Sequence, residues 1–373
     1  MRIVYFTHSL LSCWNHGNAH FLRGVLRELM HLGHDVTAFE PEESWSLAQL
    51  LEAHGPAGLD SFRTAYPELQ PRRYASLEDA EGALHDADLV LVHEWNAPEL
   101  VAELGRRRRL GARFTLMFHD THHRAVSEPE AMGAYDLDAY DGILAFGDTL
   151  AETYRRWGWG ERAFVWHEAA DTRLFRPPEK ELPRGGAVWI GNWGDGERTA
   201  ELEEFLLRPT QAAGIPLAIH GVRYPPAART LVSQYGATLR DWLPNARVPE
   251  VFARHLVTLH VPRRFYATTL PGIPTIRVFE ALACGIPLVS APWEDREGLF
   301  RPGTDYLVAT SGEVATRQLR ALRADCAMRR ELADSGVATI HARHSCAHRA
   351  EELLAIVARL RGPMVLADTA AGA

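Results

Sequence analysis

The chain has 373 residues, 46% of them hydrophobic, and a formal net charge of −8 at neutral pH. This length exceeds one ordinary hydrophobic core and fits two domains of about 170 residues each. The negative charge argues against nucleic acid as a partner. The sequence has no apolar run long enough for a membrane span, and it opens on a predicted strand rather than a signal peptide. We therefore expect a cytoplasmic protein.

Cysteine and lysine usage excludes several chemistries. Cys13, Cys284, Cys326 and Cys346 lie far apart without a CxxC motif, which favours a reducing compartment and excludes a thiolate zinc site. Lys180 is the only lysine, and it lies in a proline-rich stretch without a glycine-rich loop. P-loop, kinase-like and pyridoxal chemistry all need a lysine on phosphate or cofactor, so these classes are excluded.

The N-terminal half predicts a series of βα units. Residues 2–7 indicate a buried strand, which a polar turn joins to an amphipathic helix at 19–32 and a second strand at 35–39. Residues 44–85 are polar and predicted to be helical. Apolar runs without alternation predict further parallel strands, buried on both faces, at residues 88–93, 112–118 and 141–146.

The turn at residues 8–18 lacks the GxGxxG spacing, which argues against the usual dinucleotide-binding fingerprint and so against a dehydrogenase. Gly17 is either a simple turn glycine or a point of close approach to a ligand. His16 and His20 are candidates for contact with a substrate, with a structural role as the alternative.

Polar residues follow two of the predicted strands at their carboxyl ends, where open α/β sheets bind ligands. Glu94 and Asn96 follow the first of them, and we expect both to contact an acceptor substrate. The second delivers the sequence FHDTHHR, which holds His119, His122 and His123. A metal site there is an alternative, but this spacing matches no recognised ligand pattern.

Four consecutive arginines, residues 106–109, end the next predicted helix. Cations at this position complement the helix dipole, and a solvated helix end is the simplest interpretation. Weak association with an anionic membrane surface is the alternative.

The second half predicts another set of strands and helices after a proline-rich linker at residues 172–186. A strand at 187–190 leads into the glycine-rich sequence GNWGDGERT and a helix at 201–207, and such turns hold phosphate through backbone amides. A further strand is predicted at 216–220.

Residues 271–308 predict a loop, a buried helix, a strand and a polar loop in succession. Thr275 is the expected N-cap of the helix, which runs to Cys284 and directs its first amides toward a ligand. Glu280 lies inside this helix among apolar residues, where a carboxylate is costly without a partner. We expect that partner to be a ligand hydroxyl.

The stretch RVFEALACGIPLVSAPWED, followed by GTDYLV, resembles the nucleotide-binding signature of group 1 (GT4-like) glycosyltransferases with the two-domain GT-B fold, most of all the spore-maturation (CgeB-like) type. The resemblance implies an α/β protein with two Rossmann-like, doubly wound domains facing a cleft. The first would span residues 1–170, completed by a helix at about 345–362 that crosses back, and the second residues 186–344.

The resemblance also assigns roles to residues. It implies that Glu280 holds the ribose of a nucleotide-sugar donor and that His119 contacts the donor sugar or the acceptor near the reacting carbon, with Asp120 orienting its imidazole or binding acceptor hydroxyls. Arg198 is expected to neutralise the leaving diphosphate. Gly272 stands where the family has an acid, and backbone groups of residues 272–274 are expected to replace that contact. Asn192 stands where the family has an arginine, and Arg223, Arg263, Arg264 or Arg277 is expected to compensate. Asp241, Trp242 and Leu243 are expected to flank the base, and the other expected donor contacts are Gly17, Asn18, Gly272, Ile273, Pro274, Thr275, Ile276 and Arg277.

The resemblance implies transfer of a sugar from a nucleotide-diphosphate donor to a hydroxyl acceptor, with retention of configuration. It implies no cofactor and no catalytic metal, the nucleotide-sugar being a co-substrate. A nucleotide-sugar epimerase of the same fold and a catalytically silent nucleotide-sugar binding protein are the alternatives. The sequence specifies no oligomeric state.

Overall fold

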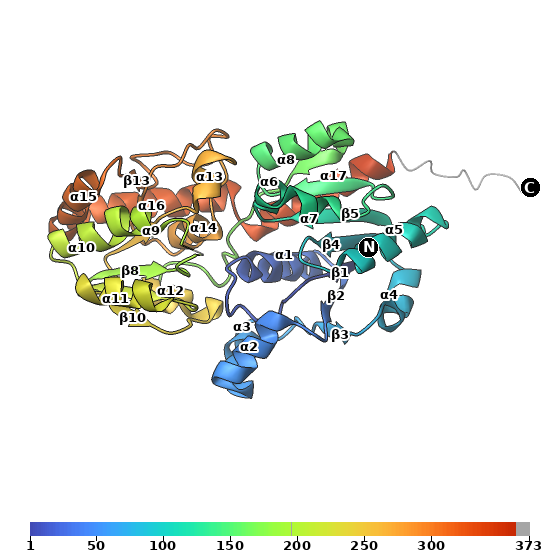
Figure 1. Ribbon diagram of the computed structural model, residues 1–373, viewed down its shortest axis with the longest axis horizontal. Helices are drawn as coiled ribbons and strands as arrows, with labels where there is room; N and C mark the ends of the chain where they lie inside the picture. Colours follow the sequence, from blue (N-terminus) through green and yellow to red (C-terminus); the bar gives the residue numbers. More distant parts are fainter. Residues whose placement is uncertain (195, 363–373) are drawn as a thin grey trace, which may run out of the picture.

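The computed structural model describes residues 1–194 and 196–362, so Asp195 of the glycine-rich loop lies outside the described residues. Within them the chain forms two parallel β-sheets flanked by helices (Figure 1). The first sheet has the strand order β3-β2-β1-β4-β5-β6-β7, and the second has the order β10-β9-β8-β11-β12-β13. The predicted α/β fold with two doubly wound domains is confirmed.

The strands of the first sheet are β1 Arg2–Phe6, β2 Asp35–Pro41, β3 Arg72–Tyr74, β4 Leu89–His93, β5 Thr115–Asp120, β6 Gly142–Ala145 and β7 Ala163–Val165. Those of the second are β8 Ala187–Ile190, β9 Leu217–His220, β10 Thr238–Arg240, β11 Val257–His260, β12 Leu288–Ser290 and β13 Leu307–Val308. Helices of the first domain are α1 Ala19–His31, α2 Trp45–His54, α3 Asp60–Ala65, α4 Glu81–His85, α5 Pro98–Arg109, α6 Arg124–Ser127, α7 Pro129–Gly133 and α8 Asp148–Tyr154. The remaining helices are α9 Thr199–Leu202, α10 Arg208–Ala212, α11 Pro226–Gln234, α12 Val248–Phe252, α13 Arg264–Thr268, α14 Ile276–Ala283, α15 Gly312–Ala324, α16 Cys326–Arg343 and α17 Cys346–Arg361.

Strand β1 shows why the predicted strands lack alternation. Ile3 and Tyr5 pack into one hydrophobic core, while Val4 and Phe6 pack into a second core on the opposite face of the sheet. Because successive side chains point to opposite faces, a strand covered by helices on both sides must be apolar throughout.

Two predicted helical segments differ from the structure. Residues 44–85 contain, besides helices, the edge strand β3, which pairs in parallel with β2. This strand has only three residues, too few to show a period. The helix predicted at 201–207 begins earlier, at Thr199. It passes through a π-helical turn at Glu203–Leu207 and continues into α10.

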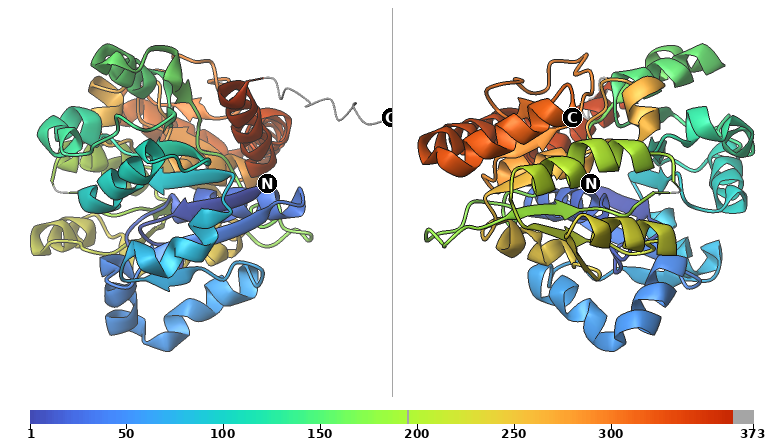
Figure 2. Two further views of the ribbon diagram at one scale, coloured as in Figure 1. Left: turned by 90° about the vertical axis from the view of Figure 1, so that its right-hand side faces the viewer. Right: turned by 60° about the vertical axis from the view of Figure 1, so that its left-hand side comes forward.

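Helix α17 returns from the second domain and packs beside α1 (Figure 2). The indole Nε1 of Trp166 donates a hydrogen bond of 2.8 Å to the carbonyl of Arg349, and Ala170 forms a bridge with Ser345. The last helix therefore completes the core of the first domain.

The domains also share core packing near the start of α14. Ile273 lies in the same hydrophobic cluster as first-domain strands β4 and β5. A Cβ atom added to Gly147 would lie 2.4 Å from Cγ1 of Ile273, and one added to Gly17 would lie 2.7 Å from Cγ2 of Ile276. These two glycines let the second domain approach the first closely.

The arginines that end α5 are all ion-paired. Their carboxylate partners, in chain order, are Glu103, Glu81 together with Glu103, Asp141 and Asp136. The run is thus largely neutralised by its own domain, and its binding to a membrane surface stays a prediction. No helix among residues 1–194 and 196–362 has both the length and the apolarity needed to cross a bilayer.

The seam between α1, α17 and the linker should tolerate no added atom at Gly24. A Cβ there would lie 2.5 Å from Sγ of Cys346 and 2.7 Å from Cβ of Asp171. We expect Gly24→Ala to cost about 1–3 kcal/mol through overpacking and to lower the melting temperature. Gly82→Ala is the matched control, because its Cβ would meet nothing within 4 Å and alanine favours helix. Equal melting temperatures for the two variants would contradict the packing described.

Candidate functional site

A cavity of about 830 Å³ lies between the two domains. Its walls come from the loops that follow strands of both sheets, because parallel strands direct their carboxyl ends to the same edge. The first domain contributes residues after β1, β4, β5, β6 and β7, and the second contributes residues after β8, β9, β10 and β11 together with the start of α14. We call this cavity the cleft.

Arg198 lies in the wall of the cleft formed by the second domain, only 9% exposed. Its guanidinium donates hydrogen bonds to the carbonyls of Asn192, Trp193 and Val261. Within the described residues no carboxylate lies within ion-pair distance of it. Burial, with the charge of nearby Arg263, lowers the pKa of Arg198 to about 10, so it remains a cation at neutral pH. Glu197 and Glu201 act on it electrostatically, but neither forms an ion pair with it.

Helix α14 begins where predicted, with Thr275 as its N-cap, but the Thr275 side chain does not cap the helix. Its Oγ1 instead lies 3.1 Å from Nε2 of His260, whose Nδ1 lies 2.9 Å from Oγ of Ser290. Burial lowers the pKa of His260 to about 3, with the charge of Arg198 acting in the same direction. A neutral imidazole therefore orients Thr275, and Thr275, Ile276 and Arg277 line the cleft.

Glu280 is fully buried and both of its carboxylate oxygens contact protein atoms. Oε1 lies 2.9 Å from Nδ1 of His20, and Oε2 accepts a hydrogen bond from Arg277. Nε2 of His20 accepts a hydrogen bond from the backbone N–H of Asp171, so the Nδ1 proton points at Glu280. Burial alone would raise the pKa of Glu280, but Arg277 and His20 hold it below its ordinary value. Contact with a ligand hydroxyl stays a prediction, and it requires Arg277 to move aside.

Residues 272–274, which precede the N-cap of α14, do not line the cleft. Gly272 has a φ of 102°, a conformation that side chains rarely adopt, and an added Cβ would lie 3.2 Å from Cβ of Arg296. Ile273 is 2% exposed, and Pro274 is buried beside it. Their expected contact with a donor stays a prediction.

The residues expected around a nucleotide base lie at one end of the cleft. Trp242 and Leu243 line it, and the indole Nε1 of Trp242 donates to the carbonyl of Cys13 across the domain boundary. Asp241 faces a neighbouring cavity of about 710 Å³ instead. Arg223 lines both cavities with a positive φ of 57°, and its guanidinium lies 5.5 Å from the ring of Trp45 on the first domain.

Gly17, Asn18 and His16 line the opposite wall. The Asn18 side chain bridges His16 and Thr121, at 2.9 Å and 2.8 Å. Gly17 lies against Ile276, so its lack of a side chain serves the contact between the domains.

His119 and Asp120, expected near the reacting carbon, are fully buried and do not line the cleft. Nδ1 of His119 lies 2.5 Å from the hydroxyl of Tyr5, and burial lowers the pKa of His119 to about 3. The carboxylate of Asp120 accepts hydrogen bonds from the Tyr154 hydroxyl at 2.7 Å and from the backbone N–H of His122 at 3.0 Å. Asp120 thus positions the loop behind β5, and a catalytic role for either residue stays a prediction.

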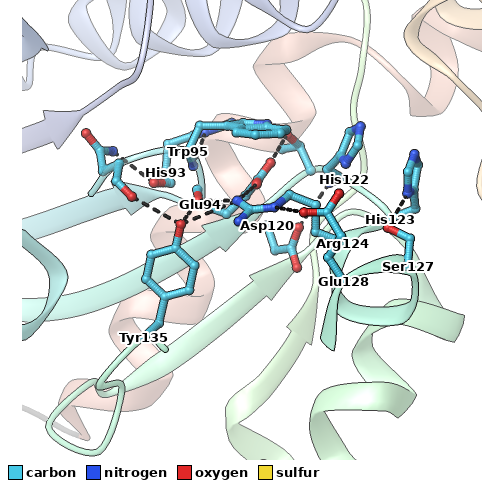
Figure 3. A network of polar contacts seen from close by, with 12 residues as sticks. His93, Glu94, Trp95, Asp120, His122, His123, Arg124, Ser127, Glu128 and Tyr135 are labelled. Atoms are coloured by element: carbon cyan, nitrogen blue, oxygen red, sulfur yellow. Dashed lines mark hydrogen bonds and ion pairs between the residues drawn. The ribbon is translucent and has the colours of Figure 1, made fainter. Parts of the chain in front are cut away.

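Glu94 and Asn96 are buried and do not line the cleft. Glu94 belongs to a polar network with Arg124 and Tyr135 (Figure 3). Burial and the charge of Asp120 raise the pKa of Glu94, and one of its oxygens lies 3.5 Å from Arg124. Asn96 donates to the carbonyls of Phe6 and His93 and accepts from Tyr74. Their expected contact with an acceptor stays a prediction.

Beside this network lie further residues of the cleft wall. Trp95 stacks over the Arg124 guanidinium at 4.5 Å and meets the ring of His122 at 5.3 Å (Figure 3). His8 and His16 lie beside them, with ring centroids 4.6 Å apart. Burial lowers the pKa of His8, of His16 to about 4, and of His122. Nδ1 of His16 is already bonded to Asn18, so the ring nitrogens left for a hydroxylated substrate are Nδ1 of His8, Nε2 of His16 and Nδ1 of His122.

Glu168 is a cleft residue that the sequence interpretation did not assign, only 4% exposed. It follows β7, and the positional rule that singled out Glu94 would have singled it out as well. Within the described residues, no group of three or more histidine, cysteine or acidic side chains is arranged to hold a metal ion.

Comparisons with known proteins place this geometry in context. The glycosyl transferase-like family model matches residues 198–355. Among solved structures, sucrose-phosphate synthase from Thermosynechococcus elongatus is 14% identical, with a TM-score of 0.64 and coverage of 96% of this chain and 98% of that chain. HepE from Anabaena in complex with UDP and glucose is also 14% identical, with a TM-score of 0.64 and coverage of 95% and 98%.

A T4 phage glucosyltransferase in complex with its UDP-glucose substrate is more distant, at 10% identity, a TM-score of 0.58 and coverage of 96% and 99%. The similarity extends over nearly the whole of each chain, so the fold is that of these two-domain GT-B proteins. A comparison with curated proteins finds no relative that matches the sequence.

The buried charge of Glu280 should make stability depend on pH. A carboxyl whose pKa is depressed on folding stabilises the fold above its unfolded pKa, near 4.3, and loses that contribution as the pH falls through the folded value. We expect Glu280→Gln to cost about 1–3 kcal/mol at neutral pH and less in acid, measured as melting temperature across pH. Glu250→Gln, in an exposed ion pair with Arg247, is the control and should change little. A deficit that is the same in acid and at neutral pH would contradict an ionised Glu280.

Proposed function

We propose that the protein is a glycosyltransferase that moves a sugar from a nucleotide-diphosphate donor to a hydroxyl acceptor. The observation that carries this proposal is the position of Arg198 in the wall of a cleft between two domains, as a buried cation whose hydrogen-bond partners among the described residues are all carbonyls. A buried charge without a counter-ion is costly, and an anionic ligand removes that cost. The matched family and the shared fold support the same assignment.

The second domain holds the donor in this proposal. Arg198 and the amides at the start of α14 face the diphosphate, while Trp242 and Leu243 flank the base. Arg223, stacked on Trp45 across the cleft, adds a further cation near the base. Glu280 binds the ribose only if Arg277 leaves it. On donor binding, Arg277 therefore exchanges its hydrogen bond to Glu280 for a contact with the donor.

The first domain holds the acceptor, on the wall formed by Trp95 and the neutral histidines His8, His16 and His122. Neutral imidazoles bind hydroxyls without attracting a second anion, and Trp95 supplies a flat apolar face. In this proposal these four residues contact the acceptor in place of Glu94 and Asn96.

Catalysis in this proposal consists of charge stabilisation and positioning. As the glycosidic bond to phosphate breaks, Arg198 and the α14 amides stabilise the charge that develops on the diphosphate. The acceptor hydroxyl attacks the anomeric carbon, and its proton passes to the departing phosphate. We propose that configuration is retained and that no metal takes part. We place the reaction in the cytoplasm, in agreement with the four free cysteine thiols.

Donor binding should depend on Arg198. HepE and the phage enzyme have structures with UDP-glucose, so UDP-glucose is the first donor to test, followed by GDP-, dTDP- and ADP-sugars. A ligand at 100 times its dissociation constant stabilises a protein by about 2.7 kcal/mol, which a thermal shift detects. We expect Arg198→Gln to abolish the shift and Arg198→Lys to keep part of it.

Arg208→Gln is the control for this experiment, since Arg208 pairs with Glu203 outside the cleft and its side chain is 61% exposed. Its ligand-induced shift should equal that of the wild type. A wild-type protein that no nucleotide-sugar stabilises would contradict the proposed function.

Turnover with an acceptor should survive removal of divalent metal. We expect transfer, measured as released nucleoside diphosphate, to be unchanged by a chelator such as EDTA, because cationic side chains and amides stabilise the leaving group. Incubation with the donor alone separates the alternatives, since an epimerase converts it to an epimer and a silent binding protein leaves it intact with every acceptor. Loss of transfer in EDTA, restored by added metal, would contradict the metal-free assignment.

A further inference from the structure

The cleft contains one buried acid, Glu168, that neither the sequence interpretation nor the proposed mechanism uses. It lies just after β7, in the segment that leads from the first sheet toward the linker. The residue is 4% exposed and lines the cleft with Phe146 and Tyr266. Its position therefore combines deep burial with access to whatever the cleft binds.

Glu168 lies against the start of α14. Its carboxyl lies close enough to the backbone N–H of Ile276, the first residue of that helix, for this amide to act on its pKa. Within the described residues no side chain donates a hydrogen bond to it, whereas Glu280, the other buried acid of this region, is bonded to both His20 and Arg277. The remaining hydrogen-bonding capacity of Glu168 is thus available to a ligand.

A charged carboxylate at this point would oppose the proposed donor site. The start of α14 is the place where the amides favour an anion, and an ionised Glu168 would compete with phosphate for it. A protonated carboxyl acts differently, since its carbonyl oxygen remains an acceptor for a nearby helix amide while its O–H donates to a phosphate oxygen. The two oxygens of one neutral acid then link the helix to the ligand.

The electrostatic surroundings favour the protonated form. Burial raises the pKa of Glu168 to about 8, and the negative charge of Glu280 acts in the same direction, while Arg277 and the Ile276 amide oppose them. Tyr266 of α13 also faces Glu168, and burial raises the pKa of that hydroxyl well above 10, so it remains neutral. A bound diphosphate adds negative charge and strengthens the preference for the proton.

We propose that Glu168 is a diphosphate-binding residue that acts as a neutral carboxyl, its O–H donating a hydrogen bond to the terminal phosphate of the bound nucleotide. This inference rests on the proposed function and adds a contact from the first domain to a ligand held mainly by the second. The same hydrogen bond strengthens as charge develops on the leaving phosphate, and so contributes to transition-state stabilisation. The acid reaches the ligand only when the domains are as close as they are here.

The test compares nucleoside diphosphates with their monophosphates, because only the former carry the terminal phosphate. UDP and UMP, and likewise GDP, dTDP and ADP with their monophosphates, are titrated into the full-length protein by calorimetry. In the pair that the wild type binds most tightly, we expect Glu168→Ala to reduce the preference for the diphosphate by about tenfold, the value of one hydrogen bond to a charged group. Glu168→Gln keeps both an acceptor and a donor and should retain most of that preference.

The pH dependence of diphosphate affinity distinguishes a direct contact by Glu168 from a merely structural role. Between about pH 7 and 9 the phosphates have completed their own titration, whereas Glu168 loses its proton. Wild-type affinity for the diphosphate should fall across this range, and the affinity of Glu168→Gln should stay level. Because glutamine is nearly isosteric, this arm remains informative if Glu168→Ala fails to fold.

Glu128→Ala is the matched control, an exposed acid on the first-domain wall of the same cleft. It should alter neither the preference for the diphosphate nor the dependence on pH. If the wild type binds no nucleoside diphosphate, both this inference and the proposed function are overturned. If it binds one, and Glu168→Ala keeps the full preference or Glu168→Gln keeps the alkaline loss, only the role of Glu168 is wrong.

Discussion

The buried hydrogen bond between His20 and Glu280 sets the relation between the two domains. His20 belongs to α1 of the first domain and Glu280 to α14 of the second, and neither side chain has any exposure to solvent. His20 also binds the backbone of Asp171 at the start of the linker, so one imidazole joins both domains and the segment between them. Removing either partner leaves an unpaired polar group in an apolar seam.

Arg198 and Glu168 are two buried groups of the cleft wall, and they do not form an ion pair with each other. Arg198 is bonded to carbonyls, and Glu168 lies near the backbone amide of Ile276. Burial shifts the two pKa values in opposite directions, downward for the guanidinium and upward for the carboxyl. At neutral pH the site therefore carries a cation and a neutral acid, and both favour an anionic ligand. The first-domain wall differs, because burial lowers the pKa of its histidines His8 and His122.

The periodicity of the sequence predicted most strands of both sheets and the helix that holds Glu280. It was insufficient for β3, which is too short to show a period, and for the π-helical turn before α10. Among site residues, the rule that ligands bind at the carboxyl ends of strands correctly placed the cleft. The rule does not tell which side chain at a strand end reaches the cleft: Glu94, Asn96 and His119 are absent from its wall, while Trp95, His122 and Glu168 line it, and the roles assigned to the first three stay predictions.

By itself, the sequence determined the two-domain α/β architecture, because hydrophobic runs, turn residues and the linker are local features whose spacing can be read directly. Only the tertiary structure decided which polar side chains face the cleft and which ones pair with each other. Glu280 illustrates the reason, since its hydrogen-bonding partner His20 lies 260 positions away in the chain. A side chain at the end of a strand points into the cleft or below it according to the packing of the loop, and that packing depends on contacts from the opposite domain.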